Sequence, residues 1–524
     1  MKQAVQRVFG LLGNRDNTWW LVVALTIVGA VLRFWNLEAA QQFLGDQGRD
    51  SLVVAKIFTD LDLVFIGPVT SIGNMYLGPA YYYFMLPFLW LSYPSPMGPI
   101  VAMAFLGTIT IPILYWVGSQ LINKRAAVIA TIFYAFSSIV MTFTRFSWNP
   151  NPEPIVMLLL LLGIYRAITK NPWYWVLAMG MFSLLIQLHY VTLLAGGVLG
   201  LFWLFELWKR IKNHHFTATF LKANGAAAGV FLLSLVPLML FDWKHNWLNA
   251  QAFKDIFVKE EAFAPSGSSL LDRVGVLAEQ LVTRAELLFF DITIGADPVR
   301  NKVLLVLLLA GVIFGIWRWL RVVKFKPSVQ NFLGLTLLLV AAAIGVIGLG
   351  AYQHQVYIHY VTFLFPVAFL LLGFVFDALL SANHIIAGVV MLVFAQFFAL
   401  HTIQTLPYQD AGWQISEIQD ASQQMVARLE PGESYDIVLL SSTRDILGSN
   451  YRYFLHTTGR PPAPDSERGN VDVLFIIDEE KKVERVVDLP IYEIVVFPNK
   501  TVDNSIEIPD GPTITILRRA ERVE

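Results

Sequence analysis

Long apolar runs separated by short polar loops make up most of the first 406 residues. A transmembrane helix needs about 20 consecutive, mainly apolar residues. Runs of this length, or close to it, begin at Trp19, Pro99, Ala126, Pro154, Trp173, Val191, Ala223, Val303, Phe332, Tyr357 and His384. The pattern therefore predicts a mainly α-helical, polytopic membrane protein with about 11 transmembrane helices plus juxtamembrane helices.

One further apolar segment, residues 81–93, is short and contains Pro87, and its status decides the topology. Cytoplasmic loops carry an excess of Lys and Arg. If this segment does not cross the membrane and the N-terminus is cytoplasmic, four basic loops all face the cytoplasm: 123–125, 166–170, 209–215 and 318–326. If the segment crosses the membrane, the first three of these loops face the extracytoplasmic side instead. We therefore predict a juxtamembrane or re-entrant element, with a cytoplasmic N-terminus, in the plasma or inner membrane.

After Leu406 the chain loses its membrane character and gains charge. Residues 415–429 have the periodicity of an amphipathic helix, and residues 437–440, 471–477, 492–497 and 513–517 have the composition of strands. These patterns predict a small soluble α/β domain over residues 407–524, on the extracytoplasmic side, after a transmembrane domain over residues 1–406.

Composition agrees with a membrane protein and narrows the chemistry. Hydrophobic residues make up 56% of the chain and charged residues 15%, against about 25% charged in a soluble domain. The net charge of -1 gives no reason to expect a nucleic-acid partner, and the absence of cysteine excludes disulfides, thiolate catalysis and Cys-ligated metals. No Walker or dinucleotide fingerprint is present, which weakens nucleotide-driven transport.

Residues 44–83 follow the first apolar run and place acids at the membrane edge, where ionisable groups are costly and often functional. Asp46 lies between Gly45 and Gln47, and Asp50 follows one helical turn later. If residues 47–58 are helical, both carboxylates project from one face near its positive N-terminus. The alternative is that Asp46 only caps the helix and Asp50 is solvated.

A second polar group lies between the apolar runs that begin at Ala126 and Pro154. Three prolines in residues 150–154 stiffen this turn. Arg145 has the geometry to bind a phosphate or carboxylate, and Glu153 to act as a base, bind a metal or orient a partner. The alternative is ordinary helix termination and capping.

Two further sets of side chains are candidates for binding. His189 closes an apolar run beside Tyr190, and residues 352–360 are dense in imidazoles and phenols, including His354, His359 and Tyr360. Such donors suit a lipid phosphate, although an aromatic belt at the membrane surface also explains them. Without an HExxH motif, zinc hydrolase chemistry has little support.

Several short motifs, taken in order, resemble those of the GT-C glycosyltransferases, which take a sugar from a polyprenyl phosphate and include the protein O-mannosyltransferases and aminoarabinose transferases. The motifs are Leu32-Arg33-Phe34-Trp35-Asn36-Leu37, Gly45-Asp46-Gln47, Gly78-Pro79-Ala80-Tyr81-Tyr82-Tyr83, Ile122-Asn123-Lys124-Arg125-Ala126, Thr144-Arg145 with Asn151-Pro152-Glu153, and His359-Tyr360 through Phe365-Pro366. The chain departs from the family at Gln47, where a second acid is usual, and at Gly78, where a basic residue is frequent.

The resemblance implies catalytic roles for Asp46, Asp50 and Glu153, with Asp46 as the general base. It implies donor-phosphate ligands among Arg49, Lys56, Arg145, His354, His359 and Tyr360, and substrate contacts from Tyr81, Tyr82, Asn149 and His189. Because Gly78 replaces a basic residue, the choice among the phosphate ligands stays open. A divalent metal also stays open, with Asp46, Glu153 and His189 as candidate ligands; no cofactor is assigned.

The expected function is therefore an inverting transfer of a sugar from a polyprenyl-phosphate donor to a protein, glycan or lipid acceptor on the extracytoplasmic face. Membrane lipid is the other expected partner. Two alternatives remain: an oligosaccharide ligase or polymerase that uses a lipid diphosphate, and a lipid or sugar transporter with Asp46 and Asp50 as coupling carboxylates.

Overall fold

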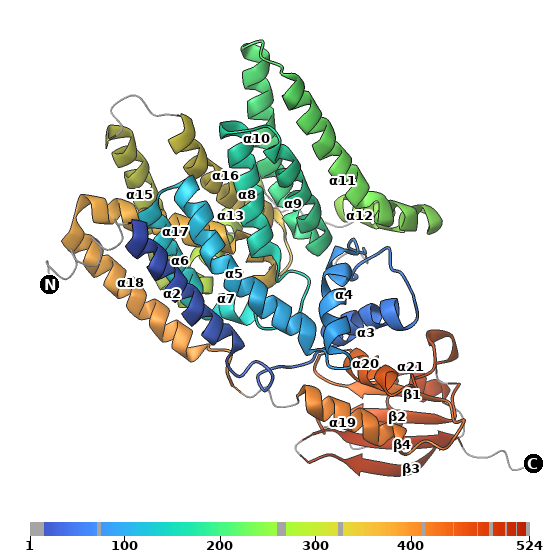
Figure 1. Cartoon of the computed structure of the whole chain (residues 1–524). Helices are drawn as coiled ribbons and strands as arrows, with labels where there is room; N and C mark the ends of the chain where they lie inside the picture. The colour runs from blue at the N-terminus through green and yellow to red at the C-terminus, as the bar shows by residue number, and fades with distance from the viewer. Residues whose placement is uncertain are drawn as a thin grey trace, which may run out of the picture. The chain divides into compact units, whose positions relative to one another are not determined.

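A computed structural model describes residues 15–70, 75–258, 269–322, 329–409, 414–443, 445–468, 470–481, 486–497, 500–509 and 511–519. The chain forms two compact units, and segments distant in sequence meet in each. The membrane unit comprises Met1–Trp35, Val64–Tyr81 and Val101–Pro407, and the mixed unit comprises Asn36–Leu63, Tyr82–Ile100 and Tyr408–Glu524. Figure 1 shows the fold, with most of the helices and all four strands of the sheet labelled.

The membrane unit consists mainly of helices. Its longer ones are α2 (Arg15–Phe34), α5 (Met97–Leu121, which the mixed unit shares at its start), α10 (Leu193–Lys212), α11 (Ala218–Lys244), α15 (Pro298–Val322), α16 (Val329–Ala351), α17 (Phe365–Ala382) and α18 (His384–Gln404). Its shorter ones are α6 (Lys124–Phe136), α7 (Ser138–Phe143), α8 (Glu153–Thr169), α9 (Tyr174–Leu188), α12 (Leu248–Val258), α13 (Leu270–Glu286) and α14 (Ile292–Ile294). The 3-10 helices η1 (Tyr190–Thr192) and η4 (Ile358–Leu364) and the π-helix η3 (Leu287–Asp291) connect them.

Eight helices in the described part of the chain are long and apolar enough to cross a membrane, so the chain is an integral membrane protein and the expected fold class is confirmed. Helices α6, α8 and α9 also lie where spans were expected, but they are shorter, with 13, 17 and 15 residues. The number of membrane crossings therefore stays a prediction. The orientation of the termini also stays a prediction. Of the basic segments on which that prediction rests, residues 1–14 and 323–326 lie outside the described residues.

Helix α17 is the centre of the membrane unit. In the most apolar 18-residue window of the segment Ile358–Ala382, 94% of the residues are buried inside the protein, against 6% in the corresponding window of α11. Gly373 lets α17 approach α6 closely, because a Cβ at this position would lie 2.3 Å from the Ala126 carbonyl oxygen. Small residues at helix crossings are how membrane helices come into close contact. An ion pair between Arg125 and Asp377 joins the same two helices near their ends.

The mixed unit is built on a four-stranded sheet in the order β1-β2-β4-β3. Its strands are β1 (Tyr435–Leu440), β2 (Val473–Asp478), β3 (Lys500–Glu507) and β4 (Thr513–Arg519). Strands β1 and β2 are parallel, with Tyr435 opposite Val473, and the other two pairings are antiparallel. The helices of this unit are α3 (Gly45–Thr59), α4 (Ala80–Ser92, which begins in the membrane unit), α19 (Ile415–Val426), α20 (Ser449–Thr457) and α21 (Tyr492–Val496).

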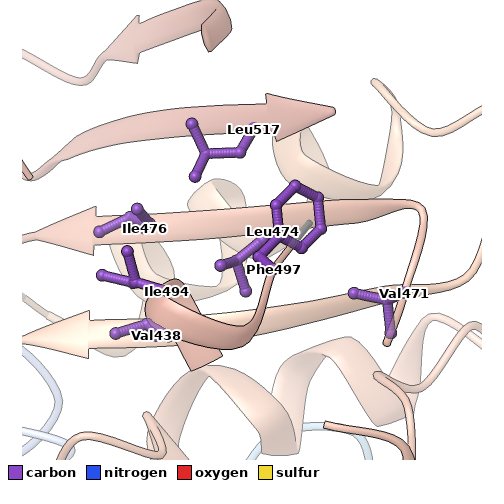
Figure 2. Close-up of a cluster of buried hydrophobic side chains, with 7 residues drawn as sticks. All are labelled: Val438, Val471, Leu474, Ile476, Ile494, Phe497 and Leu517. Carbon is purple, nitrogen blue, oxygen red and sulfur yellow. The ribbon is translucent and has the colours of Figure 1, made fainter. Parts of the chain in front are cut away.

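One face of this sheet carries a compact apolar core. Val438, Leu474 and Leu517 come from three neighbouring strands and pack with Ile494 and Phe497 from the α21 segment (Figure 2). The opposite face meets α20, because Gly448, at the start of α20, lies against Ile437 and Leu439. The sheet is therefore covered on both faces, as a buried parallel pair requires.

The expected strand at residues 492–497 is wrong: Tyr492–Val496 is a helical turn. Ile494 and Phe497 are buried, whereas Val495 and Val496 are exposed. This spacing of three puts both buried side chains on one face of a helix, whereas a strand would pair Ile494 with Val496. Strand β3 was not expected, because its polar sequence suits the edge of a sheet rather than its centre.

The core in Figure 2 predicts a measurable stability difference. Leu474 is fully buried and Val502 on β3 is 54% exposed. We expect Leu474→Ala to lower the free energy of unfolding of the C-terminal sheet by about 2–5 kcal/mol, because it leaves a cavity in a packed core. Val502→Ala should change it by less than about 0.5 kcal/mol. Pulse proteolysis of the purified protein in urea measures both; equal losses would contradict the packing described.

Candidate active site

The first helix of the mixed unit carries three charged residues within its first two turns. Helix α3 begins at Gly45, so the residue at its N-cap is Leu44 and not Asp46, and the Leu44 amide donates to Gln47 Oε1 at 3.0 Å. The capping alternative for Asp46 is therefore not supported. The residue that replaces the second acid of the family, Gln47, has a capping role instead.

Arg49 joins the two carboxylates on this helix. Its Nη1 donates to Asp46 Oδ1 at 2.8 Å, and its Nε and Nη2 donate to Asp50 Oδ1 at 2.9 and 2.8 Å. The two acids differ in environment, because the Asp46 side chain is 53% exposed and that of Asp50 is 1% exposed. The result is an exposed carboxylate connected through a cation to a buried one.

Tyr82 completes this cluster from helix α4. Its hydroxyl donates to Asp50 Oδ1 at 3.1 Å, so this one oxygen accepts from both Arg49 and Tyr82. The second oxygen of Asp50, Oδ2, is buried and has no hydrogen-bond partner among the described residues. A buried oxygen without a partner favours the protonated carboxyl group.

Burial raises the pKa of Asp50 to about 6, although the charge of Arg49 acts in the opposite direction. For Arg49, burial lowers the pKa, but the charges of Asp50 and Asp46 outweigh it and raise the pKa overall. Burial and the charge of Asp50 also raise the pKa of Tyr82. Arg49 therefore stays charged, Tyr82 stays a phenol, and Asp50 changes its charge close to neutral pH.

Lys56, a candidate phosphate ligand, lies in the last turn of α3. It lies seven positions after Arg49, which is roughly 10 Å along the helix axis. It is therefore not part of the cluster around Asp46.

In the membrane unit, Arg145 is buried and meets the end of helix α2. Its Nη1 donates to the carbonyl oxygens of Leu32, Arg33 and Trp35 at 3.2, 2.8 and 2.8 Å. The last carbonyl groups of a helix have no partner within it, and a basic side chain is a common cap. Part of the Arg145 guanidinium thus has a structural use, and its role as a phosphate ligand stays a prediction.

Glu153 lies in the first turn of α8 and is buried. Its Oε2 accepts hydrogen bonds from the Thr362 hydroxyl at 2.5 Å and from the Phe363 amide at 3.1 Å, both in η4. No described residue forms a hydrogen bond with its Oε1. The carboxylate therefore connects two helix ends and retains one oxygen for another partner.

His189, His359 and Tyr360 lie together in the membrane unit. The ring of His189 is 5.9 Å from that of His359 and 5.2 Å from that of Tyr360, and Trp148 lies 4.6 Å from His359. Burial, with a smaller contribution from His359, lowers the pKa of His189 to about 3, so its imidazole is neutral at physiological pH. His354 is exposed, and no described ring contact joins it to this cluster.

The remaining residues predicted to contact substrate, Tyr81 and Asn149, are buried and form hydrogen bonds within the protein. The Tyr81 hydroxyl and Ser147 Oγ are 2.8 Å apart, and Asn149 Nδ2 donates to the Leu188 carbonyl at 2.6 Å. Sequence reasoning missed Ser147 and Thr362, because a lone hydroxyl gives no pattern. At Gly78, the position of the second departure, a Cβ would lie 2.5 Å from Gln187 Oε1, so a larger side chain there requires Gln187 to move.

The candidate ligands for a metal are divided between the units. Asp46 belongs to the mixed unit, whereas Glu153 and His189 belong to the membrane unit. Within the described residues, no group of three or more His, Asp or Glu side chains could hold a metal ion.

No protein-family model matches the sequence, and no curated protein is significantly similar to it. Solved structures do match. ArnT from Cupriavidus metallidurans bound to undecaprenyl phosphate has a TM-score of 0.57 and 13% identity, over 96% of this chain and 99% of that chain. The Archaeoglobus fulgidus oligosaccharyltransferase with Zn and sulfate has a TM-score of 0.51 and 13% identity, over 87% and 68%.

A second structure of the Archaeoglobus enzyme, tethered with an acceptor peptide, has a TM-score of 0.52 and 12% identity, over 97% of this chain and 74% of that chain. All of these belong to the GT-C superfamily. The chain has the GT-C fold. The GT-C resemblance read from short motifs is therefore confirmed in the fold, while the roles of individual GT-C site residues stay predictions.

The raised pKa of Asp50 predicts a pH-dependent stability. Because folding raises this pKa from 3.8 to about 6, the contribution of Asp50 to stability is fully present below pH 3.8 and is lost as the pH rises through about 6. The loss amounts to about 3 kcal/mol. Asp50→Asn cannot ionise, so its stability relative to the wild type should rise over this range. Urea unfolding of the purified wild type and Asp50→Asn between about pH 4 and pH 7 measures this difference in stability. Asp62→Asn is the control. A stability difference between Asp50→Asn and the wild type that stays constant with pH would contradict the raised pKa of Asp50.

Proposed function

We propose that this protein is a membrane glycosyltransferase that moves a sugar from a polyprenyl-phosphate donor to an acceptor, with inversion and with Asp46 as the general base. The observation that carries the proposal is the Asp46–Arg49–Asp50 arrangement on α3. The GT-C fold supports it, because the ArnT structure of that fold was obtained with undecaprenyl phosphate. The donor, the acceptor and the roles of these residues are inferences of ours.

The reaction is a displacement at the anomeric carbon. Asp46 accepts the proton of the acceptor hydroxyl while its oxygen forms a bond to the anomeric carbon. The bond from that carbon to the phosphate oxygen breaks on the opposite face, and the polyprenyl phosphate leaves with the bonding electrons. Attack from the opposite face inverts the configuration. No nucleotide is consumed, and a phosphate is a good leaving group once donors meet its charge.

The environments of the two acids suit different tasks. Asp46 is exposed enough to reach an acceptor, and Arg49 restricts its orientation through a charge-assisted hydrogen bond. Asp50 is buried and accepts two donors from Arg49, so it fixes the guanidinium. Asp50 is therefore a positioning residue in this proposal, and its ionisation near pH 6 controls how firmly Arg49 is held.

For the leaving phosphate, Arg145 has less support than the other predicted donors, because its Nη1 already donates to carbonyl groups. His354, His359 and Tyr360 lie in or beside η4, and Arg49 and Lys56 lie on α3. We keep these five as candidates. Glu153, through its second oxygen, is a candidate for orienting substrate in the membrane unit.

A transporter that uses Asp46 and Asp50 as coupling carboxylates has less support. Coupling acids lie near the middle of the bilayer on broken spans, and α3 is not among the helices able to cross a membrane. An oligosaccharide ligase or polymerase keeps the same general base and differs in its donor, which experiment can distinguish.

Replacement of the proposed base gives the most direct test. We expect Asp46→Asn to lower kcat for sugar transfer by at least ~10²-fold, since it preserves shape and removes the proton acceptor. Transfer of radiolabelled sugar from polyprenyl phosphate, with purified protein in lipid, is the measurement. Asp62→Asn, an exposed acid beyond the same helix, is the matched control and should retain activity. Near-normal transfer by Asp46→Asn would refute the assignment.

The pH profile of that reaction tests the role of Asp50. Because Asp50 must ionise to hold Arg49 and has a pKa of about 6, kcat should fall about tenfold per pH unit below this value. Asp50→Asn should have lower activity at every pH and lack this acid limb. An unchanged limb in Asp50→Asn would assign it to another group.

The identity of the donor separates the two enzyme hypotheses. We expect sugar transfer to release a polyprenyl monophosphate, because that is the leaving group of a monophosphate-linked donor. Mass spectrometry of the lipid product after one turnover identifies it. Release of a polyprenyl diphosphate would instead favour the ligase or polymerase.

A further inference from the structure

The helix that carries the proposed base lies against a helix from the end of the chain. Gly45 and Gly48 of α3 face the region where α20 begins. A Cβ on Gly45 would lie 2.3 Å from Asp445 Oδ2, and a Cβ on Gly48 would lie 2.4 Å from the Asn450 backbone nitrogen and Cα. Real Cβ atoms do not come so close to backbone atoms, so only glycine permits the contact at Gly48, whereas the neighbour of Gly45 is a side chain that can move.

Specific side-chain contacts fix the register of the two helices. Asn450 Nδ2 donates to the carbonyl oxygen of Phe43 at 3.1 Å, in a buried position. The ring of Phe43 lies 5.7 Å from that of Tyr453 and 5.6 Å from that of Phe454. Residues Asn36–Leu63 and Tyr408–Glu524 accordingly belong to the same compact unit.

Helix α20 is itself tied to the sheet. Arg452 forms an ion pair with the buried Asp436 of β1 and donates from its Nε to the Leu447 carbonyl at 2.7 Å. The Tyr451 hydroxyl donates to Glu479 Oε1 at 3.0 Å, just beyond β2. The amide of Ser449 is capped by Asp445 Oδ2 at 2.8 Å. The position of α20 is therefore set by the C-terminal sheet.

The contact leaves the charged side of α3 on another face. Successive helical residues are turned by about 100°, so Asp46 and Asp50 project well away from Gly45 and Gly48. Tyr82 meets Asp50 from α4. Helix α3 thus lies between α20, which meets its glycine face, and α4, which meets its acid face.

We propose that Asn450 and helix α20 are positioning elements of the catalytic carboxylates, so that the C-terminal domain forms part of the transfer site rather than a separate binding module. This rests on the proposed function of Asp46. The C-terminal domain determines the placement of α3, and α3 determines that of Asp46, Arg49 and Asp50. Asn450 acts through these residues and touches no substrate in this account.

The first test displaces α3 with a single methyl group. Gly48→Ala must shift the helix by up to about 1 Å, and a misplacement of that size costs up to ~10²-fold. We expect kcat to fall by ~10- to 10²-fold, while the KM for the donor changes by less than ~2-fold. Because the shift would make Asp50 less buried, we also expect the acid limb of the pH profile of kcat to move below pH 6. The matched control is Gly275→Ala in helix α13, where no atom lies within 4 Å of the added Cβ. This variant should keep the kcat and the pH profile of the wild type.

The second test uses the absence of cysteine from the chain. In Gly45→Cys with Asp445→Cys, the two Cβ positions are 2.8 Å apart, near enough for a disulfide after a small outward adjustment. We expect oxidation in membranes to form this crosslink and the crosslinked protein to transfer sugar at a rate within ~3-fold of its reduced form, since the docked arrangement is the active one.

These outcomes separate the positioning role from the proposed function. If Asp46→Asn is inactive while Gly48→Ala and Asn450→Ala match Gly275→Ala, the positioning role is overturned and the function stands. If the crosslink does not form, or abolishes transfer until it is reduced, positioning is likewise overturned. If the crosslink forms but Asp46→Asn remains active, the function of Asp46 fails instead. Should Gly48→Ala not fold, Asn450→Ala and the crosslink decide.

Discussion

Backbone groups at helix ends must find partners inside the protein, because the membrane offers none. Much of the polar chemistry in the membrane unit serves this need. Arg145 donates to the last carbonyl groups of α2, Asn123 caps α6, and Glu153 accepts from the end of η4, just before α17. Polar residues next to apolar runs are therefore first of all structural, and a role in substrate binding has to use the atoms that remain.

The cluster on α3 follows a different rule. Asp50 is buried beside a charged Arg49 that it shares with the exposed Asp46. Burying one acid is costly, and capping a helix does not require it, since Gln47 already serves the Leu44 amide. A costly arrangement without an evident structural need is a reasonable place to look for function.

Much of this molecule could be predicted from its sequence. Apolar runs predict the main helices, and the short motifs taken in order indicate the GT-C fold. The roles of individual residues are harder to predict from the sequence. Asp46 and Asp50 stood out because carboxylates at a membrane edge are conspicuous, but the bridging position of Arg49 and the contact from Tyr82 depend on side-chain directions that no pattern records.

The sequence also does not show how side chains pack, and this explains the wrong prediction of a strand near the C-terminus. Residues 492–497 have the composition of a strand, and only the packing of Ile494 and Phe497 against the sheet shows that they form a turn of helix. The contact between Gly48 and Asn450 could not be predicted either. It pairs residues from opposite ends of the chain, and neither residue belongs to a motif.

That contact also has a consequence for biosynthesis. Phe43 and Asn450 are 407 residues apart, so the ribosome makes the acid-bearing helix long before the helix that receives it. Local contacts can form early, whereas this one must wait until α20 has been synthesised. A nascent chain halted before α20 would carry every proposed catalytic side chain and still lack the support that seats α3.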